Sequence, residues 1–393
     1  MLSLLEELKL ELELLKGGDK LKRFVPSYRP EPGYVFHRDR RLLDFTDWDC
    51  LNAGLSGRVR RAAQSEIESS GISSGASRLS SGTRDVHLLC EAALARLMNC
   101  PAAVLFSSRN QAVLSLITSL ITERDMVIVE ESMQSPVLDA AYLVGAETRT
   151  FNFESISLLA EDLERNTKKG RCFIFFEALS PISGKLADLK SMAFLVGRFG
   201  IVPVVDETYA LGLIGARGAG SPELLPQSDW LRCHYAELSY GVGSYGAFVS
   251  GDAVLVSFLI NKSRTFLSEP PLPQALAAAT LTAIEVVESL PQERQKISFL
   301  ASRLHNGLTA LGMLCTGDSA VPFVCMKLKN VSAADEIGKF LMRKGFFVDT
   351  IRSSTLLSES AVIRMLINVK HTERNIDDLL DAYSEILPKL NGR

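Results

Sequence analysis

The chain has 393 residues, of which 47% are hydrophobic and 23% charged, and its formal net charge at pH 7 is −3. This length predicts two domains, or one large domain with an appendage. The slightly acidic balance provides no basic surface for nucleic acid, and no run of about 18 apolar residues predicts a membrane span.

Seven cysteines are scattered along the chain, without a C-x-x-C pair or a histidine in ligand spacing. This pattern indicates buried thiols in a reducing compartment, and we expect no metal site. The first eight residues carry acidic side chains and lack the basic segment that opens a signal peptide. We therefore expect a soluble, cytoplasmic protein.

Helices alternate with short apolar strands through the first two thirds of the chain. Residues 2–15 have a helix-like pattern of leucine with glutamate and lysine, which predicts an arm, and a proline-rich connector follows at 26–33. Continuous apolar strands between helices are typical of a mostly parallel sheet covered on both faces. The strands predicted here lie at 103–106, 126–129, 148–151, 172–176 and 201–205.

After residue 251 the pattern changes to long helices and then to a smaller α+β unit. The predicted division of the chain has three parts. An arm and connector occupy residues 1–45, a large α/β domain residues 46–287, and a small C-terminal α+β domain residues 288–393.

Two stretches indicate a binding site. Asp206 ends the apolar run Val204-Val205, so it lies at the carboxyl edge of a central strand, where ligands bind in open α/β sheets. A carboxylate there can accept a hydrogen bond from the protonated ring nitrogen of pyridoxal phosphate (PLP), or it can cap the following turn. The second stretch, residues 71–83, surrounds Arg78 with small residues, which indicates an ordered loop with close backbone approach or a flexible linker.

With residues 105–108, 212–219, 238–246 and Ile363-Arg364, these stretches resemble the PLP-dependent α-oxoamine synthase family. Its members include 8-amino-7-oxononanoate synthase, 2-amino-3-ketobutyrate–CoA ligase and serine palmitoyltransferase, which join an amino acid to an acyl thioester. The resemblance covers roughly residues 26–390. It implies a fold-type I PLP-transferase, similar to aspartate aminotransferase, with a mostly parallel seven-stranded sheet and a small C-terminal α+β domain. It also implies a transferase that forms a dimer and takes acyl-CoA and amino-acid ligands.

The same resemblance shows departures at the site. The family's leucine-serine-lysine, whose lysine forms the Schiff base with PLP, reads Leu238-Ser239-Tyr240. Tyr209 replaces the histidine that contacts the phenolic oxygen of the cofactor, and Gln134 replaces the histidine that stacks on its ring. On the phosphate side, Arg109 and Asn110 replace glycine and tyrosine, while Glu237 and Glu269 add acidic groups.

The resemblance assigns the remaining site residues as follows. Arg364 matches the arginine that binds the substrate carboxylate, and Arg78 joins it as a substrate-binding candidate. The cofactor-binding candidates are Asp206, Ser239, Ser108, Gln134, Tyr209 and Glu177. No catalytic residue is intact, because Tyr240 stands at the lysine position.

The absence of a lysine amine at residue 240 determines the function that we expect. PLP catalysis uses a lysine amine both as the Schiff-base partner and as the base that moves the Cα proton. A tyrosine forms no imine, and its usual pKa near 10 leaves little phenolate at neutral pH. We therefore expect an 8-amino-7-oxononanoate synthase-like protein that is catalytically impaired and binds PLP only non-covalently, weakly or not at all. It would be a homodimer, or the non-catalytic subunit of a heterodimer with a lysine-bearing paralogue.

Two alternatives remain open. The first is an active acyl-CoA:amino-acid C-acyltransferase that uses non-covalent PLP or another lysine, with Lys185 and Lys262 as the nearest candidates in sequence. The second is an anion-binding or ligand-binding module without PLP, in which Arg78, Arg109 and Arg364 contact the ligand. For each of these arginines, an ordinary salt bridge is the competing interpretation.

Overall fold

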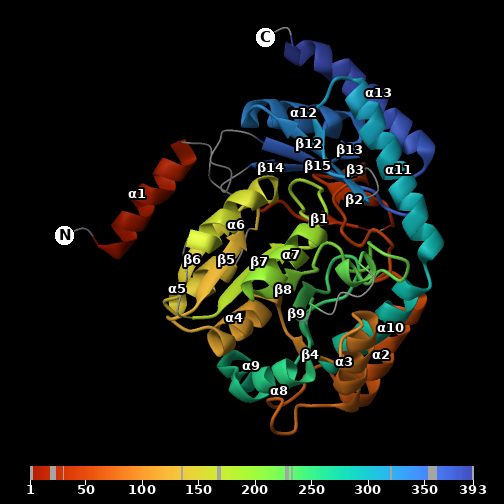
Figure 1. Cartoon of the computed structure of the whole chain (residues 1–393). Coiled ribbons are helices and arrows are strands. Elements are labelled where there is room, and N and C mark those ends of the chain that lie inside the picture. The colour runs from red at the N-terminus through yellow and green to blue at the C-terminus, as the bar shows by residue number, and fades with distance from the viewer. Residues whose placement is uncertain are drawn as a thin grey trace.

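The computed structural model describes residues 3–17, 24–29, 31–133, 136–165, 170–225, 230–231, 233–318, 321–352 and 361–391. A seven-stranded sheet with the strand order β4-β10-β9-β8-β7-β5-β6 forms its centre (Figure 1). Strand β10 is antiparallel to both of its neighbours, and the other described pairings in this sheet are parallel. The predicted mostly parallel sheet of a fold-type I architecture is therefore confirmed. Its strands are β4 (Ala102–Phe106), β5 (Met126–Glu130), β6 (Glu147–Phe151), β7 (Cys172–Glu177), β8 (Val202–Asp206), β9 (Cys233–Glu237) and β10 (Ala247–Gly251).

Helices cover both faces of this sheet, as the continuous apolar strands require. One face packs against α4 (Arg109–Leu120), α5 (Pro136–Leu143), α8 (Ala253–Lys262) and α9 (Arg264–Ser268). The other face packs against α3 (Asp85–Leu97), α6 (Ile156–Arg165), α7 (Leu189–Phe199) and α10 (Gln274–Glu288), and α2 (Gly57–Ser70) lies against α10.

A second sheet, with the strand order β11-β12-β15-β14, forms the smaller C-terminal unit beside the large sheet (Figure 1). Its helices α11, α12 and α13 contribute buried side chains to the same hydrophobic cluster as its strands. The elements are α11 (Pro291–Ala310), β11 (Cys315–Thr316), β12 (Phe323–Leu328), α12 (Val331–Lys344), β14 (Asp349–Arg352), β15 (Ala361–Leu366) and α13 (Glu373–Asn391).

The N-terminal segment contributes more structure than the predicted connector. Strands β1 (Ser27–Tyr28), β2 (Tyr34–His37) and β3 (Arg40–Asp44) form a sheet with β13 (Phe346–Phe347), which pairs in parallel with β3. Helix α1 (Leu4–Gly17) forms as expected but buries none of its residues. None of the helices described here has the length and apolar character needed to cross a membrane.

The sheet brings three acidic residues to one edge. Parallel strands β5, β7 and β8 end at Glu130, Glu177 and Asp206, and Glu177 is in register with Asp206. The carboxyl ends of parallel strands meet at one edge of a sheet, so these carboxylates form the acidic floor of the candidate site.

Candidate functional site

The acidic floor is buried. Glu130, Glu177 and Asp206 are 8%, 3% and 1% exposed. Burial raises the pKa of Glu177 well above its usual range, and the nearby Asp206 and Glu130 charges raise it further. Burial also raises the pKa of Glu130. Within the described part of the chain, Oε2 of Glu177 has no hydrogen-bond partner. The raised pKa values favour protonated side chains at Glu177 and Glu130, so it is the buried Asp206 carboxylate that a nearby cation would stabilise.

Arg109 supplies that cation. It is the first residue of α4, and its Nη2 forms an ion pair with Oδ2 of Asp206. The other Asp206 oxygen accepts a hydrogen bond from the backbone N–H of Thr208 at 2.9 Å, which caps the following turn. Burial is the largest single influence on the pKa of Arg109 and acts to lower it, but Asp206 and the further acidic groups Tyr235, Tyr209 and Glu177 together raise it above its usual range. The guanidinium therefore stays protonated against the carboxylate.

Aromatic side chains lie beside this ion pair. The rings of Tyr240 and Tyr209 are stacked, with centroids 5.3 Å apart and an interplanar angle of 16°. The Trp48 ring contacts both, at 4.8 Å from Tyr209 and 5.2 Å from Tyr240. Burial raises the pKa of the Tyr240 hydroxyl, and Glu237 adds to this effect, so the phenol is neutral at physiological pH.

The other two candidate arginines also form internal ion pairs. Arg364 pairs with Asp349 at 2.5 Å, donates to the carbonyl of Pro181 at 2.8 Å, and lies 4.8 Å from the Trp48 ring centroid. Arg78 donates to both oxygens of Glu91 on α3, at 2.8 and 3.1 Å. Both pairs are buried within the fold: the Arg364 and Arg78 side chains are 12% and 8% exposed. Their roles towards a substrate stay a prediction.

The remaining candidates have local roles. Ser108 caps α4, because its Oγ accepts a hydrogen bond from the N–H of Gln111 at 3.2 Å. Ser239 donates to Glu237 at 3.0 Å. Gln134 lies outside the described residues. The structure therefore brings most of the candidates together around one site, namely Asp206, Glu177, Tyr209, Tyr240, Arg364 and Arg109. Arg78 lies apart from this group, because its described contacts are with Glu91, Thr83 and Phe266.

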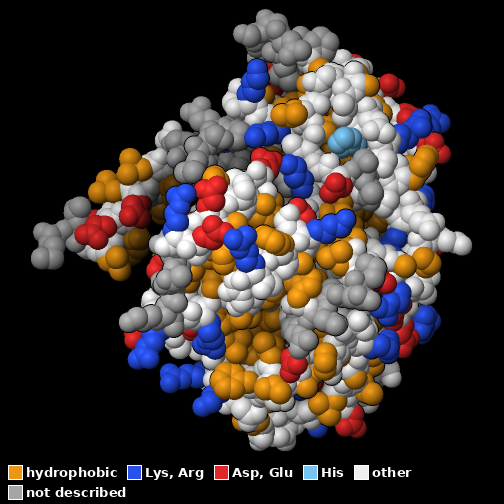
Figure 2. Space-filling view, viewed as in Figure 1, with side chains coloured by type: hydrophobic (Ala, Val, Ile, Leu, Met, Phe, Trp, Pro, Cys, Tyr) orange, Lys and Arg blue, Asp and Glu red, His pale blue; other side chains and the backbone are white. Residues whose placement is uncertain are grey.

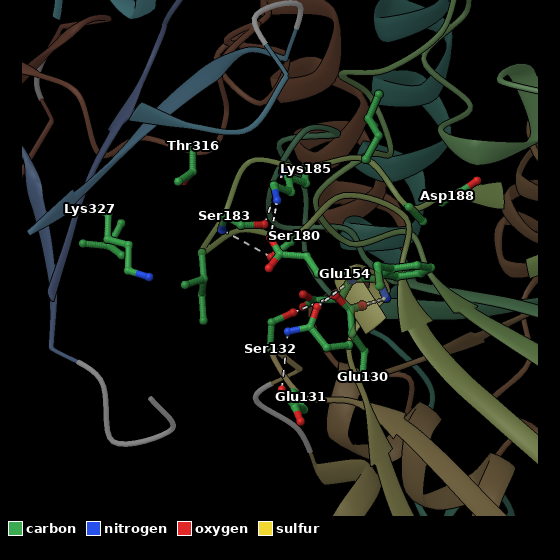
Figure 3. A pocket seen from close by; sticks show the side chains of 17 residues that line it. Glu130, Glu131, Ser132, Glu154, Ser180, Ser183, Lys185, Asp188, Thr316 and Lys327 are labelled. Carbon is green, nitrogen blue, oxygen red and sulfur yellow. Dashed lines mark hydrogen bonds and ion pairs between the residues drawn. The ribbon is translucent and has the colours of Figure 1, made fainter. Parts of the chain in front are cut away.

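Two cavities adjoin the site. The smaller, of about 150 Å³, lies between Glu177, Tyr209 and Arg364. The larger, of about 450 Å³, shares Glu177 and is shown in Figure 3, where Glu130, Glu131 and Glu154 gather on one side and Lys327 lies across from them.

The two lysines considered from the sequence lie elsewhere than beside Asp206. Lys185 lines the larger cavity, with its Nζ 2.5 Å from a carboxylate oxygen of Glu154. Lys262 lines a separate cavity with residues of α4, α5 and α9.

Sequence reasoning missed two residues of this site. Trp48 comes from the segment that precedes α2, and it is one of only two tryptophans in the chain. A lone tryptophan between two aspartates, Asp47 and Asp49, was the available signal. Glu130 had a clearer signal, because it ends a predicted strand in the same way as Asp206.

Comparisons with known proteins agree with this architecture. The model of the family described as aminotransferase class I and II matches residues 43–382. An 8-amino-7-oxononanoate synthase from Anaeromyxobacter dehalogenans is 30% identical over 97% of this chain and 95% of its own length. The protein of the same name from Acidithiobacillus ferrooxidans is 29% identical over 97% of this chain and 98% of its own length.

Solved structures show the same fold. A serine palmitoyltransferase from S. paucimobilis, with a bound PLP–myriocin aldimine, has a TM-score of 0.92 at 21% identity and covers 100% of both chains. An 8-amino-7-oxononanoate synthase from Francisella tularensis has a TM-score of 0.76 at 20% identity, covering 89% of this chain and 99% of its own.

Proposed function

Because this chain belongs to the aminotransferase class I and II family, and within it to the α-oxoamine synthases, we propose that it is a non-catalytic member that forms no covalent bond to PLP. The proposal rests on Tyr240, which the sequence resemblance matches to the family's lysine and which lies stacked on Tyr209 within the site. A phenol forms no imine. Its raised pKa also makes it a poor base for a Cα proton.

The donor set does not fit PLP in the way the family would hold it. A protonated ring nitrogen needs the Asp206 carboxylate as its acceptor, but Oδ2 of Asp206 is paired with Arg109 and Oδ1 accepts from Thr208. Glu237 adds a carboxylate next to Tyr240, where a phosphate dianion would meet like charge. We therefore propose that PLP binds weakly and non-covalently, or not at all.

A second chain would supply the missing lysine. We propose that this 8-amino-7-oxononanoate synthase-like chain supports a lysine-bearing paralogue in a heterodimer, with a homodimer as the alternative assembly. Apolar surface supports an assembly of this kind. Figure 2 shows hydrophobic side chains gathered over α4, α8 and α9. Leu143 at the end of α5 and Val254 on α8 are 75% and 78% exposed. Exposed apolar patches of this kind mark interaction sites.

Borohydride reduction in the presence of PLP tests the catalytic half of the proposal. The purified full-length chain is incubated with stoichiometric PLP, its visible spectrum is recorded, and the protein is reduced, digested and analysed by mass spectrometry. We expect neither a Schiff-base absorption band nor a stoichiometric phosphopyridoxyl-lysine. The 8-amino-7-oxononanoate synthase of Anaeromyxobacter dehalogenans serves as the positive control. A single, fully labelled lysine in this chain would refute the proposal and favour the active acyltransferase.

Co-expression tests the assembly half. A lysine-bearing paralogue from the same genome is tagged and purified together with this chain, and the mass of the complex is measured. We expect a one-to-one complex. A stable homodimer of this chain that never exchanges with the paralogue would refute the heterodimer.

A further inference from the structure

We propose that Arg109 is a built-in counter-ion that occupies the place of a protonated aromatic ring at Asp206, and that removing it opens a site for small planar cations. This inference rests on the proposed function, because it identifies the Asp206 cleft with the family's cofactor cleft. It goes further by assigning the occupant of that cleft to the chain itself.

The position of Arg109 explains how it reaches Asp206. Ser108 caps α4 at the end of β4, so the Arg109 side chain starts at the edge of the sheet where the site lies. Strand β8, which carries Asp206, is separated from β4 by β10 and β9. The guanidinium spans this gap above β9, where its central carbon lies 6.0 Å from the ring centroid of Tyr235.

The surroundings require a cation at this place. The Asp206 side chain is fully buried, and in the described part of the chain its only ion-pair partner is Arg109. Glu177 lies beside Asp206 in register, and burial raises its pKa well above the usual range, so Asp206 is the carboxylate whose charge needs a partner. A buried carboxylate without a partner is strongly disfavoured, so the apo fold would carry this cost if Arg109 were the glycine usual in the family.

The chemistry of the occupant also defines the ligand class. A guanidinium is planar, cationic and rich in N–H donors, which are the properties of a protonated aminopyridine. Tyr209 and Tyr240 lie close enough to Arg109 for its charge to act on the pKa of each phenol group, in the lowering direction. Aromatic faces also attract planar cations. Without the Arg109 side chain, the site would have an acidic floor and aromatic neighbours.

Arg109→Ala with 4-aminopyridine tests this proposal. The probe is protonated at neutral pH and carries no aldehyde, so it binds without covalent chemistry. We expect a saturable rise in the thermal midpoint of Arg109→Ala and no rise in the wild-type chain. Aniline, a neutral ring of similar size, should give no rise in either protein.

Two variants control for unspecific effects. Arg109→Ala combined with Asp206→Asn should lose the response, because the carboxylate that holds the probe is gone. Arg58→Ala removes an exposed arginine that pairs with Glu285 at 2.7 Å, and it should behave like the wild type. If Arg109→Ala is unfolded alone, recovery of its near-UV circular dichroism with the probe supports the proposal. If it stays unfolded with the probe, Arg109→Gln is titrated in its place.

The outcomes are separable from those of the proposed function. Equal probe binding by the wild type and Arg109→Ala would overturn the inference, because Arg109 would then not be the occupant. A folded Arg109→Ala or Arg109→Gln that ignores the probe would also overturn it. A Schiff base on some lysine of the wild-type chain would refute the proposed function instead, without changing the aminopyridine result.

Discussion

The Arg109–Asp206 ion pair gives the sharpest quantitative prediction. Arg109→Met keeps much of the length of the side chain and removes its charge. Removing one partner of a buried pair costs about 3–5 kcal/mol of unfolding free energy. Arg109 is 14% exposed, and Asp206 keeps its hydrogen bond from Thr208. Both features reduce the penalty, so we expect a loss near the lower limit, about 3 kcal/mol.

A double-mutant cycle separates this pair from general packing. Asp206→Asn should also destabilise the fold, because it leaves the Arg109 guanidinium buried without its carboxylate. The double variant should recover much of the loss, with a coupling energy of about 2–3 kcal/mol. As a matched control, the Arg58–Glu285 pair, with side chains 55% and 51% exposed, should couple by less than about 1 kcal/mol.

Urea unfolding at neutral pH measures the four free energies of each cycle. Tryptophan fluorescence reports on the site, because Trp48 packs against Tyr209 and Tyr240. Circular dichroism of the same samples tests for two-state behaviour. Additive effects of the two substitutions, with coupling under about 0.5 kcal/mol, would refute the view that Arg109 is the counter-ion of Asp206.

Further predictions concern other parts of the chain. Tyr240→Lys alone should give no PLP Schiff base while Arg109 holds Asp206, whereas Tyr240→Lys with Arg109→Gly should give one; a borohydride-trapped adduct in the single variant would contradict this. Burial, with the charge of Asp47, raises the pKa of Asp49 to about 7, so the native state keeps a proton that the unfolded chain loses above about pH 4. The free energy of unfolding should therefore fall as the pH rises from about 4 to about 7. In urea unfolding, Asp49→Asn should make this pH dependence weaker, and an unchanged dependence would contradict the prediction. Gly212→Ala places a Cβ 2.3 Å from a backbone oxygen at a φ of +82°, which should cost at least about 1–3 kcal/mol in the same assay, and a neutral result would be inconsistent with this geometry. Deletion of residues 1–17 should leave the unfolding free energy within about 0.5 kcal/mol of the wild type, since α1 buries nothing; a larger loss would mean that α1 packs against the fold or a second copy.

The large sheet was predictable where its strands are continuous apolar runs. The run at 172–176, for example, became β7 with every residue from Phe173 to Glu177 buried. Strands β9 and β10 were not found from the pattern, because β9 carries His234 and Glu237 among its five residues and β10 ends in Ser250-Gly251. Only the family resemblance implied that the sheet has seven strands.

Pairing between distant segments could not be read from periodicity. The pairing of β3 with β13 joins Leu43 to Phe346, some three hundred residues apart, and no local pattern records such a partner. The same limit applies to the site. The apolar run before Asp206 placed this carboxylate at a ligand-binding edge, but nothing near residue 109 shows that its guanidinium turns towards β8. Trp48 was missed for the same reason.

The proposed substitutions at residues 109 and 240 can be linked through charge. The buried Arg109 guanidinium brings to Asp206 the positive charge and the N–H donors that a pyridinium ring would bring. We therefore infer that an arginine at residue 109 and a ring held by Asp206 compete for the same carboxylate. Once no ring is held there, a lysine at residue 240 would put a third cation near Arg109 and Arg364, with no aldehyde to form an imine with it. A neutral phenol stacked on Tyr209 avoids that repulsion. We therefore propose that Tyr240 and Arg109 depend on each other, and that both fill the cleft with the chain's own side chains.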